Sequence, residues 1–440
     1  MRIKIISALT ALLTSLSLLG AAFSSVNTND SVREPSKTET TAPITGDGTS
    51  TTLNVVKYGD KLTQDQVMSQ IKAQYLIENG GYKDTDEVVV LVSVDGESLI
   101  ETFNDGKTTA KTVSEYAETF SGVAQTAENV KRQNEVISRL KKSGLITGVE
   151  YNYTTVLNAV AVNTVYGNLE AIENTVGVKS AALSDTYNKV EEQMSDATDV
   201  PLNVVDIEDT GIYKNESGYT GLGTVTAVLD SGFDMSHRVF DRDYTGKEDK
   251  LVITKSSSQS ELYVKGAAES AVKLNTLNAG ATTSGLQVKD VWYSDKIPYV
   301  YDYADKDPDV FPYDSEHGTH VAGIIAGYDE VIHGIAPDTQ LVLMKVFPDL
   351  DSGGRTEDII AALEDAVKLG VDAINMSLGS SCGFARECDD DDEKPNVAKV
   401  YDAINESGIS LITAASNSYS AGFGGEQGNT NFVTNPDSGT

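Results

Sequence analysis

The first apolar run in the chain extends from Ile5 to Leu19 and follows a short basic N-terminus. The small residues Gly20-Ala21-Ala22 come directly after it. This order is typical of a cleaved export signal, and the run is shorter than the about 20 apolar residues that a membrane span needs. An uncleaved anchor helix is the alternative. We expect a signal peptide over residues 1–23 and, since no later stretch is long enough, no membrane span.

The next segment, residues 24–80, is mostly polar. Ser24 to Thr52 is rich in Ser, Thr, Asp and Gly and shows no apolar period, which favours a flexible spacer. From Gln64 to Leu76 the apolar residues recur at helical spacing and predict a short amphipathic helix.

Residues 81–190 carry a pattern of strands and helices that predicts a small α+β domain of ferredoxin-like type. The apolar, β-branched run Val88 to Val94 indicates a buried strand. A long helical pattern, a pair of strands, a second helix and a last strand follow, over about Ser114–Lys142, Tyr151–Val165, Gly167–Ile172 and Val176–Leu183. This is the order of a split βαβ domain.

A different alternation begins at Thr224 and continues through the last expected domain, residues 200–440. Strands are expected at about Val225–Leu229, Gln340–Val346, Val371–Met376 and Ile409–Ala414, and helices at about His320–Gly327, Glu357–Leu369 and Asn396–Ser407. Such alternation predicts an α/β fold with a parallel sheet flanked by crossover helices. The mixed and polar stretch from Asp241 to Pro308 is interpreted as an irregular surface insertion.

Charge and cysteine content limit the classes of function. The formal net charge is −32, which argues against nucleic acid and anionic membranes as partners. Two cysteines, Cys382 and Cys388, do not make a disulfide scaffold. The run Asp389 to Asp392 is interpreted as a solvated acidic loop, with a cation site as the alternative.

Three short segments carry candidate chemistry. In Val228-Leu229-Asp230-Ser231-Gly232 a buried strand ends in a carboxylate, where open parallel sheets form ligand sites. Alone this signal is weak, since a structural turn Asp is as good an explanation. Ile412-Thr413-Ala414-Ala415-Ser416-Asn417 is a strand that ends in an amide. Asn417 can donate to an anionic oxygen, or can simply form a turn.

The third segment is His317-Gly318-Thr319-His320-Val321-Ala322-Gly323, a histidine at a glycine-rich helix start. Its small residues allow close packing that holds the imidazole still. Two histidines three residues apart are also compatible with a metal site, but the zincin motif has a different spacing and a Glu between its histidines. We therefore favour His317 as an acid–base group.

Together these segments resemble the subtilase family of serine proteases, from about Thr220 to Asn417. The histidine motif matches without a change, and Asn375-Met376-Ser377-Leu378-Gly379 resembles the family's substrate-binding strand. The resemblance implies a subtilisin-like fold and an Asp-His-Ser triad to which Asp230 and His317 contribute. It further implies Asn417 in the oxyanion site and Ser377, Leu378 and Gly379 as substrate-binding residues.

Within the family, Tyr299-Val300-Tyr301-Asp302-Tyr303-Ala304-Asp305 followed by Ser315-Glu316-His317 resembles the lactocepin and C5a-peptidase branch. Those are cell-envelope proteases of Gram-positive bacteria. By the same resemblance, residues 81–190 look like an inhibitory propeptide of the I9-like type. The tail from Thr186 to Leu202 would then lie extended along Ser377–Gly379, as a substrate does.

The sequence departs from the family at two points. The nucleophilic serine of the family lies in a Gly-Thr-Ser-Met-Ala stretch after the oxyanion Asn, and the 440 residues contain none. We expect that serine beyond Thr440 and expect this chain itself to be inactive. An Asp that often serves calcium would fall at Val239, so no cofactor is implied firmly and calcium is left open.

The expected function is therefore that of a secreted serine endopeptidase precursor. Its partners would be extended protein or peptide substrates and its own propeptide. Attachment to the cell wall through a further C-terminal region is left open. The alternative is a non-catalytic pseudoprotease or surface-binding protein on the same fold. The coding sequence downstream of Thr440 would separate the two.

Overall fold

The computed structural model of the protein describes residues 82–184, 186–189, 218–265, 269–313, 315–330, 332–349, 353–379 and 397–414. The expected signal peptide, the spacer and its helix, both cysteines, the four-aspartate run and Asn417 lie outside these described residues. Across the part of the chain that is described, no helix is both long enough and apolar enough to cross a membrane.

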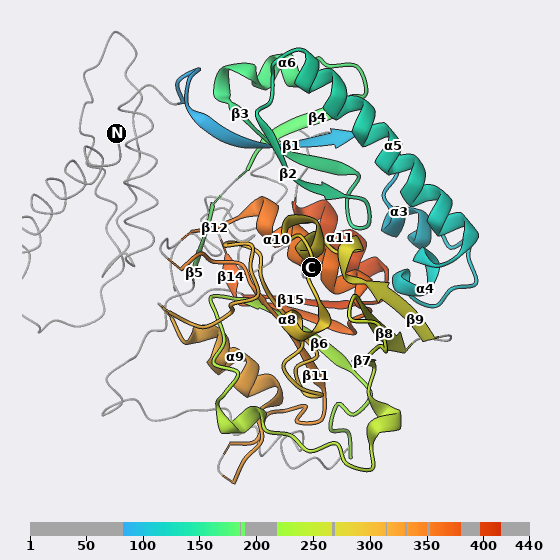
Figure 1. Ribbon diagram of the computed structural model, residues 1–440, viewed down its shortest axis with the longest axis vertical. Helices are drawn as coiled ribbons and strands as arrows, with labels where there is room; N and C mark the ends of the chain where they lie inside the picture. Colours follow the sequence, from blue (N-terminus) through green and yellow to red (C-terminus); the bar gives the residue numbers. More distant parts are fainter. Residues whose placement is uncertain are drawn as a thin grey trace, which may run out of the picture. The chain divides into compact units, whose positions relative to one another are not determined.

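Residues 82–189, called here the N-terminal module, contain an antiparallel sheet with the order β2-β3-β1-β4 (Figure 1). The strands are β1 (Glu87–Val94), β2 (Gly148–Tyr153), β3 (Ala159–Val165) and β4 (Val178–Leu183). Helices α5 (Phe120–Lys142) and α6 (Leu169–Glu173) connect them and pack on one face, where Val136 and Ile172 share a core with Val90 and Val160. This is the expected split βαβ arrangement.

One expectation for this module is wrong. The pattern from Ser114 to Lys142 predicted a single helix, whereas the chain forms α4 (Val113–Ala117) and then α5. Thr119 separates the two helices, because its side chain accepts the N–H of Gly122 at 3.0 Å and caps α5. A threonine that caps a new helix start competes with continuation of the first helix.

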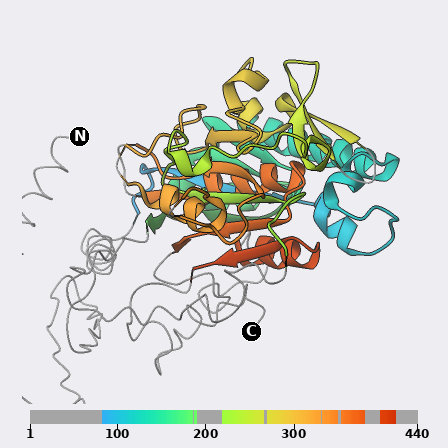
Figure 2. The same ribbon diagram turned by 90° about the horizontal axis from the view of Figure 1, so that it is seen from below.

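The second half of the described chain is built on a parallel sheet of order β10-β11-β6-β13-β15, so the expected subtilisin-like α/β fold is confirmed. The strands are β6 (Val225–Asp230), β10 (Tyr299–Asp302), β11 (Gln340–Lys345), β13 (Ala373–Met376) and β15 (Ser410–Thr413). Edge strand β15 and the helix before it form the red segment in Figure 2.

Both faces of this sheet are covered, which suits its nearly continuous apolar strands. Val225, Ala227 and Leu229 share a core with α10 (Thr356–Lys368) and α11 (Val397–Glu406). Val228 points to the other face and packs with α9 (His317–Ala326). The three helices lie where the sequence pattern placed them.

The stretch from Asp241 to Pro308, called here the insertion, is not the irregular surface segment that was expected. It forms a three-stranded sheet, two short helices and edge strand β10. Its apolar runs are too short to be recognised by period, yet Leu262, Leu277 and Trp292 are buried in the main core. Its further elements are β7 (Ile253–Lys255), β8 (Glu261–Lys265), β9 (Glu269–Lys273), α7 (Asn278–Thr282) and α8 (Val288–Val291).

Within the described residues, helix α3 (Leu99–Asn104) and 3₁₀ turns at Tyr166–Asn168, Arg238–Phe240, Glu248–Lys250 and Leu274–Thr276 connect these elements. Helix α3 begins at a capping box in which Ser98 and Glu101 each accept the other's backbone N–H.

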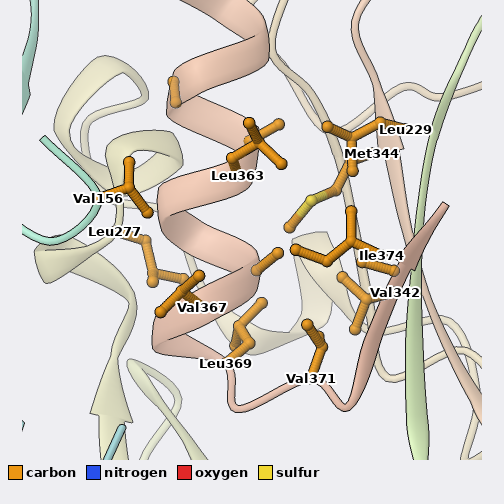
Figure 3. Close-up of a cluster of buried hydrophobic side chains, with 14 of the residues drawn as sticks. Val156, Leu229, Leu277, Val342, Met344, Leu363, Val367, Leu369, Val371 and Ile374 are labelled. Carbon is orange, nitrogen blue, oxygen red and sulfur yellow. The ribbon is translucent and has the colours of Figure 1, made fainter. Parts of the chain in front are cut away.

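One helix joins the three parts of the fold. Figure 3 shows Leu363 and Val367 of α10 between Val156 of the N-terminal module, Leu277 of the insertion and side chains of the parallel sheet. All of these side chains are buried. The N-terminal module therefore contributes to the same apolar cluster as the sheet and is not a loosely tethered domain.

Helix α10 also buries a carboxylate against the insertion. Asp365 accepts the backbone N–H groups of Asn278 at 2.7 Å and Ala279 at 3.0 Å, at the start of α7. It also accepts the hydroxyl of Tyr303 at 2.8 Å. Complete burial raises the pKa of Asp365 from 3.8 to about 6, although Lys368 and these hydrogen bonds favour the charged form.

This shift predicts a pH dependence of stability. Since the folded-state pKa of Asp365 is the higher one, folding takes up a proton, and the stabilisation is present below pH 4 and lost as the pH rises through 6. Relative to Asp365→Asn, the free energy of unfolding should fall by about 3 kcal/mol across that window. Urea titrations between pH 4 and 7, followed by the fluorescence of the single tryptophan, Trp292, measure it. Parallel pH profiles for the two proteins would contradict the prediction.

Candidate active site

The candidate residues gather at the carboxyl edge of the parallel sheet, where ligand sites of such sheets form. Asp230 is the last residue of central strand β6, and Ser377 directly follows the neighbouring strand β13. Strand β15 ends at Thr413, four residues before Asn417, which lies outside the described residues. The structure thus brings Asp230 and the Ser377 strand to one edge.

Asp230 and His317 form a direct hydrogen bond. His317 Nδ1 lies 2.7 Å from Asp230 Oδ1, although 87 residues separate the two in sequence. Asp230 is 1% exposed, and the same oxygen accepts the N–H of Ser231 at 2.7 Å. An ionised carboxylate can only accept, so a hydrogen bond to it requires the imidazole tautomer that donates from Nδ1. The contact thus fixes the orientation of the imidazole ring.

Two glycines permit this approach. A Cβ on Gly318, the residue after His317, would lie 2.4 Å from the carbonyl oxygen of Gly232 and 2.9 Å from Asp230 Cβ. Gly232 itself has a φ of 146°, which side chains rarely adopt. Both motifs thus need glycine beside the functional residue, so that the helix start of α9 can pack against the end of β6. His320, the other histidine of the motif, is exposed.

A lysine lies next to Asp230 on the sheet. Lys345 of β11 is in register with Asp230, and its ammonium bonds to Asp302 Oδ2 at 2.7 Å and to Asp349. Burial raises the pKa of Asp302 to about 7, against the pull of the ammonium. The two aspartates on Lys345 keep its own pKa above the ordinary value in spite of burial.

Together with Asp305, the two carboxylates of Asp302 and Asp349 form the one group among the described residues that has the geometry of a metal site. The ammonium of Lys345 already serves as their cation, with Asp305 Oδ2 at 3.9 Å. Val239, where the family's calcium Asp would fall, is buried and apolar. These carboxylates therefore act as partners of Lys345.

Ser377, Leu378 and Gly379 border an extended peptide segment. Strand β14 (Leu378–Gly379) pairs antiparallel with β5 (Thr186–Lys189), which comes from the end of the N-terminal module. On its other side β5 pairs with β12 (Gly353–Arg355). The tail thus lies as the middle strand between two strands of the sheet's carboxyl edge. This is how an extended peptide adds to a sheet.

Sequence reasoning missed the second strand that pairs with this tail, Gly353 to Arg355. The available signal was a pair of glycines between strand β11 and helix α10. Glycines in such a place allow another backbone to approach closely. A Cβ on Gly354 would meet the carbonyl oxygen of Val346 at 2.9 Å.

Residues 221–438 match the model of the Subtilase family, peptidase S8. The chain carries a subtilase domain. The PI-type proteinase of Lactococcus lactis subsp. cremoris is 30% identical over 286 residues, which are 62% of this chain and 13% of that protein. A C5a peptidase of Streptococcus pyogenes serotype M6 is 32% identical over 242 residues, which are 52% of this chain and 18% of that protein.

These relatives confirm the family and the branch that the motifs indicated. The chain spans less than a fifth of the length of either relative. Among solved structures, the epidermin leader peptide processing serine protease of Staphylococcus aureus superposes with a TM-score of 0.39 at 13% identity. The match covers 75% of this chain and 60% of that one.

Proposed function

We propose that this subtilase domain is part of a secreted serine endopeptidase with an Asp-His-Ser triad, in which His317 is the general base and then the general acid and Asp230 orients it. The observation that carries the proposal is the 2.7 Å hydrogen bond between the two residues at the carboxyl edge of the sheet. Its setting within a subtilase domain supports it further.

In this mechanism His317 Nε2 takes the proton of the serine hydroxyl while the serine oxygen bonds to the substrate carbonyl carbon. The tetrahedral intermediate then collapses, the C–N bond breaks, and the imidazolium gives its proton to the leaving amine. Water repeats the sequence on the acyl-enzyme. Asp230 keeps the Nδ1 tautomer and stabilises the imidazolium, for which its burial and its bond to Ser231 N–H fix it in place.

Two further roles complete the proposal. Asn417 donates to the oxyanion of the tetrahedral intermediate, a contribution of about 10²–10³ in kcat where such a donor has been removed. Ser377 to Gly379, together with Gly353 to Arg355, offer backbone groups to an extended substrate. The pairing of β5 with both β12 and β14 supports this binding mode.

We further propose that the N-terminal module is an inhibitory propeptide. Its tail, Thr186–Lys189, occupies the strand position that a substrate would take. Its β2 strand and the turn after it also bond to α10, which leads from the site's edge. The export signal expected in residues 1–23 agrees with action outside the cell.

The test of catalysis compares two polypeptides. The 440 residues contain no Gly-Thr-Ser-Met-Ala stretch, so the 440-residue chain is compared with a longer polypeptide that includes one. That longer form should hydrolyse casein and react with a fluorophosphonate probe, whereas the 440-residue chain should remain unlabelled. Labelling at a serine within residues 1–440, or a stop codon directly after Thr440 in the gene, would contradict the proposal.

A further inference from the structure

The turn after strand β10 contacts strand β2 of the N-terminal module. Lys306 in this turn forms an ion pair with Glu150, and its ammonium lies 5.3 Å from the centroid of the Tyr151 ring. The hydroxyl of Tyr151 donates toward the carbonyl oxygen of Tyr303, at 2.9 Å. It also lies 3.0 Å from Asp358 Oδ1 on α10. Two neighbouring residues of one strand are thus bound by one turn of the insertion.

A β-bulge makes this double contact possible. Val149 pairs with Val162 and Tyr151 pairs with Ala161. Since Ala161 and Val162 are consecutive on β3, Glu150 is an extra residue inserted into β2. In a regular strand, neighbouring side chains point to opposite faces of the sheet, and a bulge re-aims one of them. Here Glu150 and Tyr151 both contact Lys306.

Hydrogen bonds within the insertion hold the turn that carries Lys306, independently of the N-terminal module. The backbone groups of Asp302 and Asp307 bond to each other at 2.8 and 3.1 Å. The carbonyl of Lys306 accepts the hydroxyl of Thr283 at 2.9 Å. Lys306 has a φ of 63°, and no other described residue except glycine has a positive φ. A surrounding structure must impose such a conformation, and it is concentrated at functional positions.

The environment of Lys306 is also electrostatically demanding. Its side chain is 33% exposed and that of Glu150 is 23% exposed. Burial lowers the pKa of Lys306, while the nearby carboxylates of Asp358 and Glu357 favour its charged form and Arg355 opposes it. A half-buried charge that loses its partner leaves the other charge uncompensated, which weakens a complex more than the loss of a rim contact does.

We propose that Lys306 is a specificity determinant for the N-terminal module: it selects, through Glu150 and Tyr151, the module that belongs with this subtilase domain. The insertion then supplies part of the docking surface, beside α10. The inference rests on the proposed role of the module as a propeptide that becomes a separate partner after cleavage. A module without the acidic–aromatic pair on a bulge would bind this domain more weakly.

The test uses the full chain with a site-specific protease sequence placed between residues 191 and 217 and a fluorescent label on its N-terminus. After cleavage and dilution, the dissociation rate of the labelled module is measured. Lys306→Glu and Glu150→Lys should each accelerate dissociation by about tenfold or more, and the double variant should recover most of that loss. Lys289→Glu in the insertion and Lys131→Glu on α5 change exposed lysines and should leave the rate unchanged.

The inference would be overturned if the single variants dissociated at the wild-type rate. It would also be overturned if the double variant dissociated at least as fast as the faster of the two single variants. If a charge swap fails to fold, Lys306→Gln and Glu150→Gln provide the same cycle, with loss in each and no further loss in the double variant as the expected result. The readout is retention and not proteolysis. If dissociation depends on these charges but the module fails to inhibit the longer protease, the propeptide role is disproved and the inferred contact still holds.

Discussion

Replacement of His317 by alanine should lower kcat for peptide hydrolysis by about 10⁶-fold in a polypeptide that includes the family's serine segment. The histidine is the base for attack and the acid for departure of the amine, so both halves of the reaction lose their proton carrier. KM should change little, because His317 does not belong to either strand that pairs with the tail segment. Initial rates on casein and on a short chromogenic peptide measure the two constants.

The matched control is His320→Ala, three residues further along the same helix. His320 is exposed, and His317 is the one that lies 2.7 Å from Asp230. Activity should survive in this variant. Asp230→Asn keeps the shape but offers an amide where the imidazole needs an acceptor, so a loss of about 10⁴-fold is expected. An inactive His320→Ala beside an active His317→Ala would refute the assignment.

The parallel sheet could be predicted because the pattern of its strands and helices is local, whereas the roles of Asp230 and His317 were implied by the resemblance of their motifs to the family. Four of the five residues from Val225 to Leu229 are apolar, as a strand buried on both faces requires, and strands and helices alternate after it. Gly318, directly after His317, indicates a close packing contact that a side chain would prevent. A strand end and a helix start that carry Asp230 and His317 meet at the sheet edge by the topology of the fold alone.

The acidic residues of α10 show where sequence reasoning fails. Glu357, Asp358, Glu364 and Asp365 are the polar positions of an amphipathic helix and predict a solvent-facing side. All four are buried, because the N-terminal module and the insertion cover that side. Nothing local to the helix signals this. Their carboxylates accept from backbone N–H groups and from serine and tyrosine hydroxyls that lie 62 to 210 residues away.

The tail strand was harder still to find from its residues. Thr186 to Lys189 is polar and has no period, yet it pairs on both sides, with β12 and with β14. Pairing of this kind uses main-chain groups, which every residue other than proline offers alike. The resemblance to the family predicted contact with Ser377–Gly379, and the structure adds Gly353–Arg355 as the second partner.

Glu364→Ala is expected to lower the free energy of unfolding of the full chain by about 3–5 kcal/mol. Glu364 is completely buried and accepts the backbone N–H groups of Thr154, Thr155 and Val156 at 3.0 to 3.3 Å. It also pairs with Lys368 Nζ at 2.8 Å. Alanine would leave three buried backbone donors without their acceptor, and Lys368 would keep only its bond to the Thr276 carbonyl oxygen.

A matched control exists on α5, where Glu135 pairs with Arg139 at the same i, i+4 spacing. Those side chains are 51% and 43% exposed, so Glu135→Ala should cost no more than about 0.5 kcal/mol. Urea titrations followed by Trp292 fluorescence give both values under identical conditions.

The position of the loss separates this explanation from general damage to the core. Hydrogen exchange at the amides of residues 154–156 should accelerate in Glu364→Ala, since these groups lose their acceptor. Amides in the β1–β3 ladder, for example at Val90 and Val162, bond within the N-terminal sheet and should open only with the whole module. Similar losses in Glu364→Ala and Glu135→Ala, or unchanged exchange at residues 154–156, would show that Glu364 does not hold the module on α10.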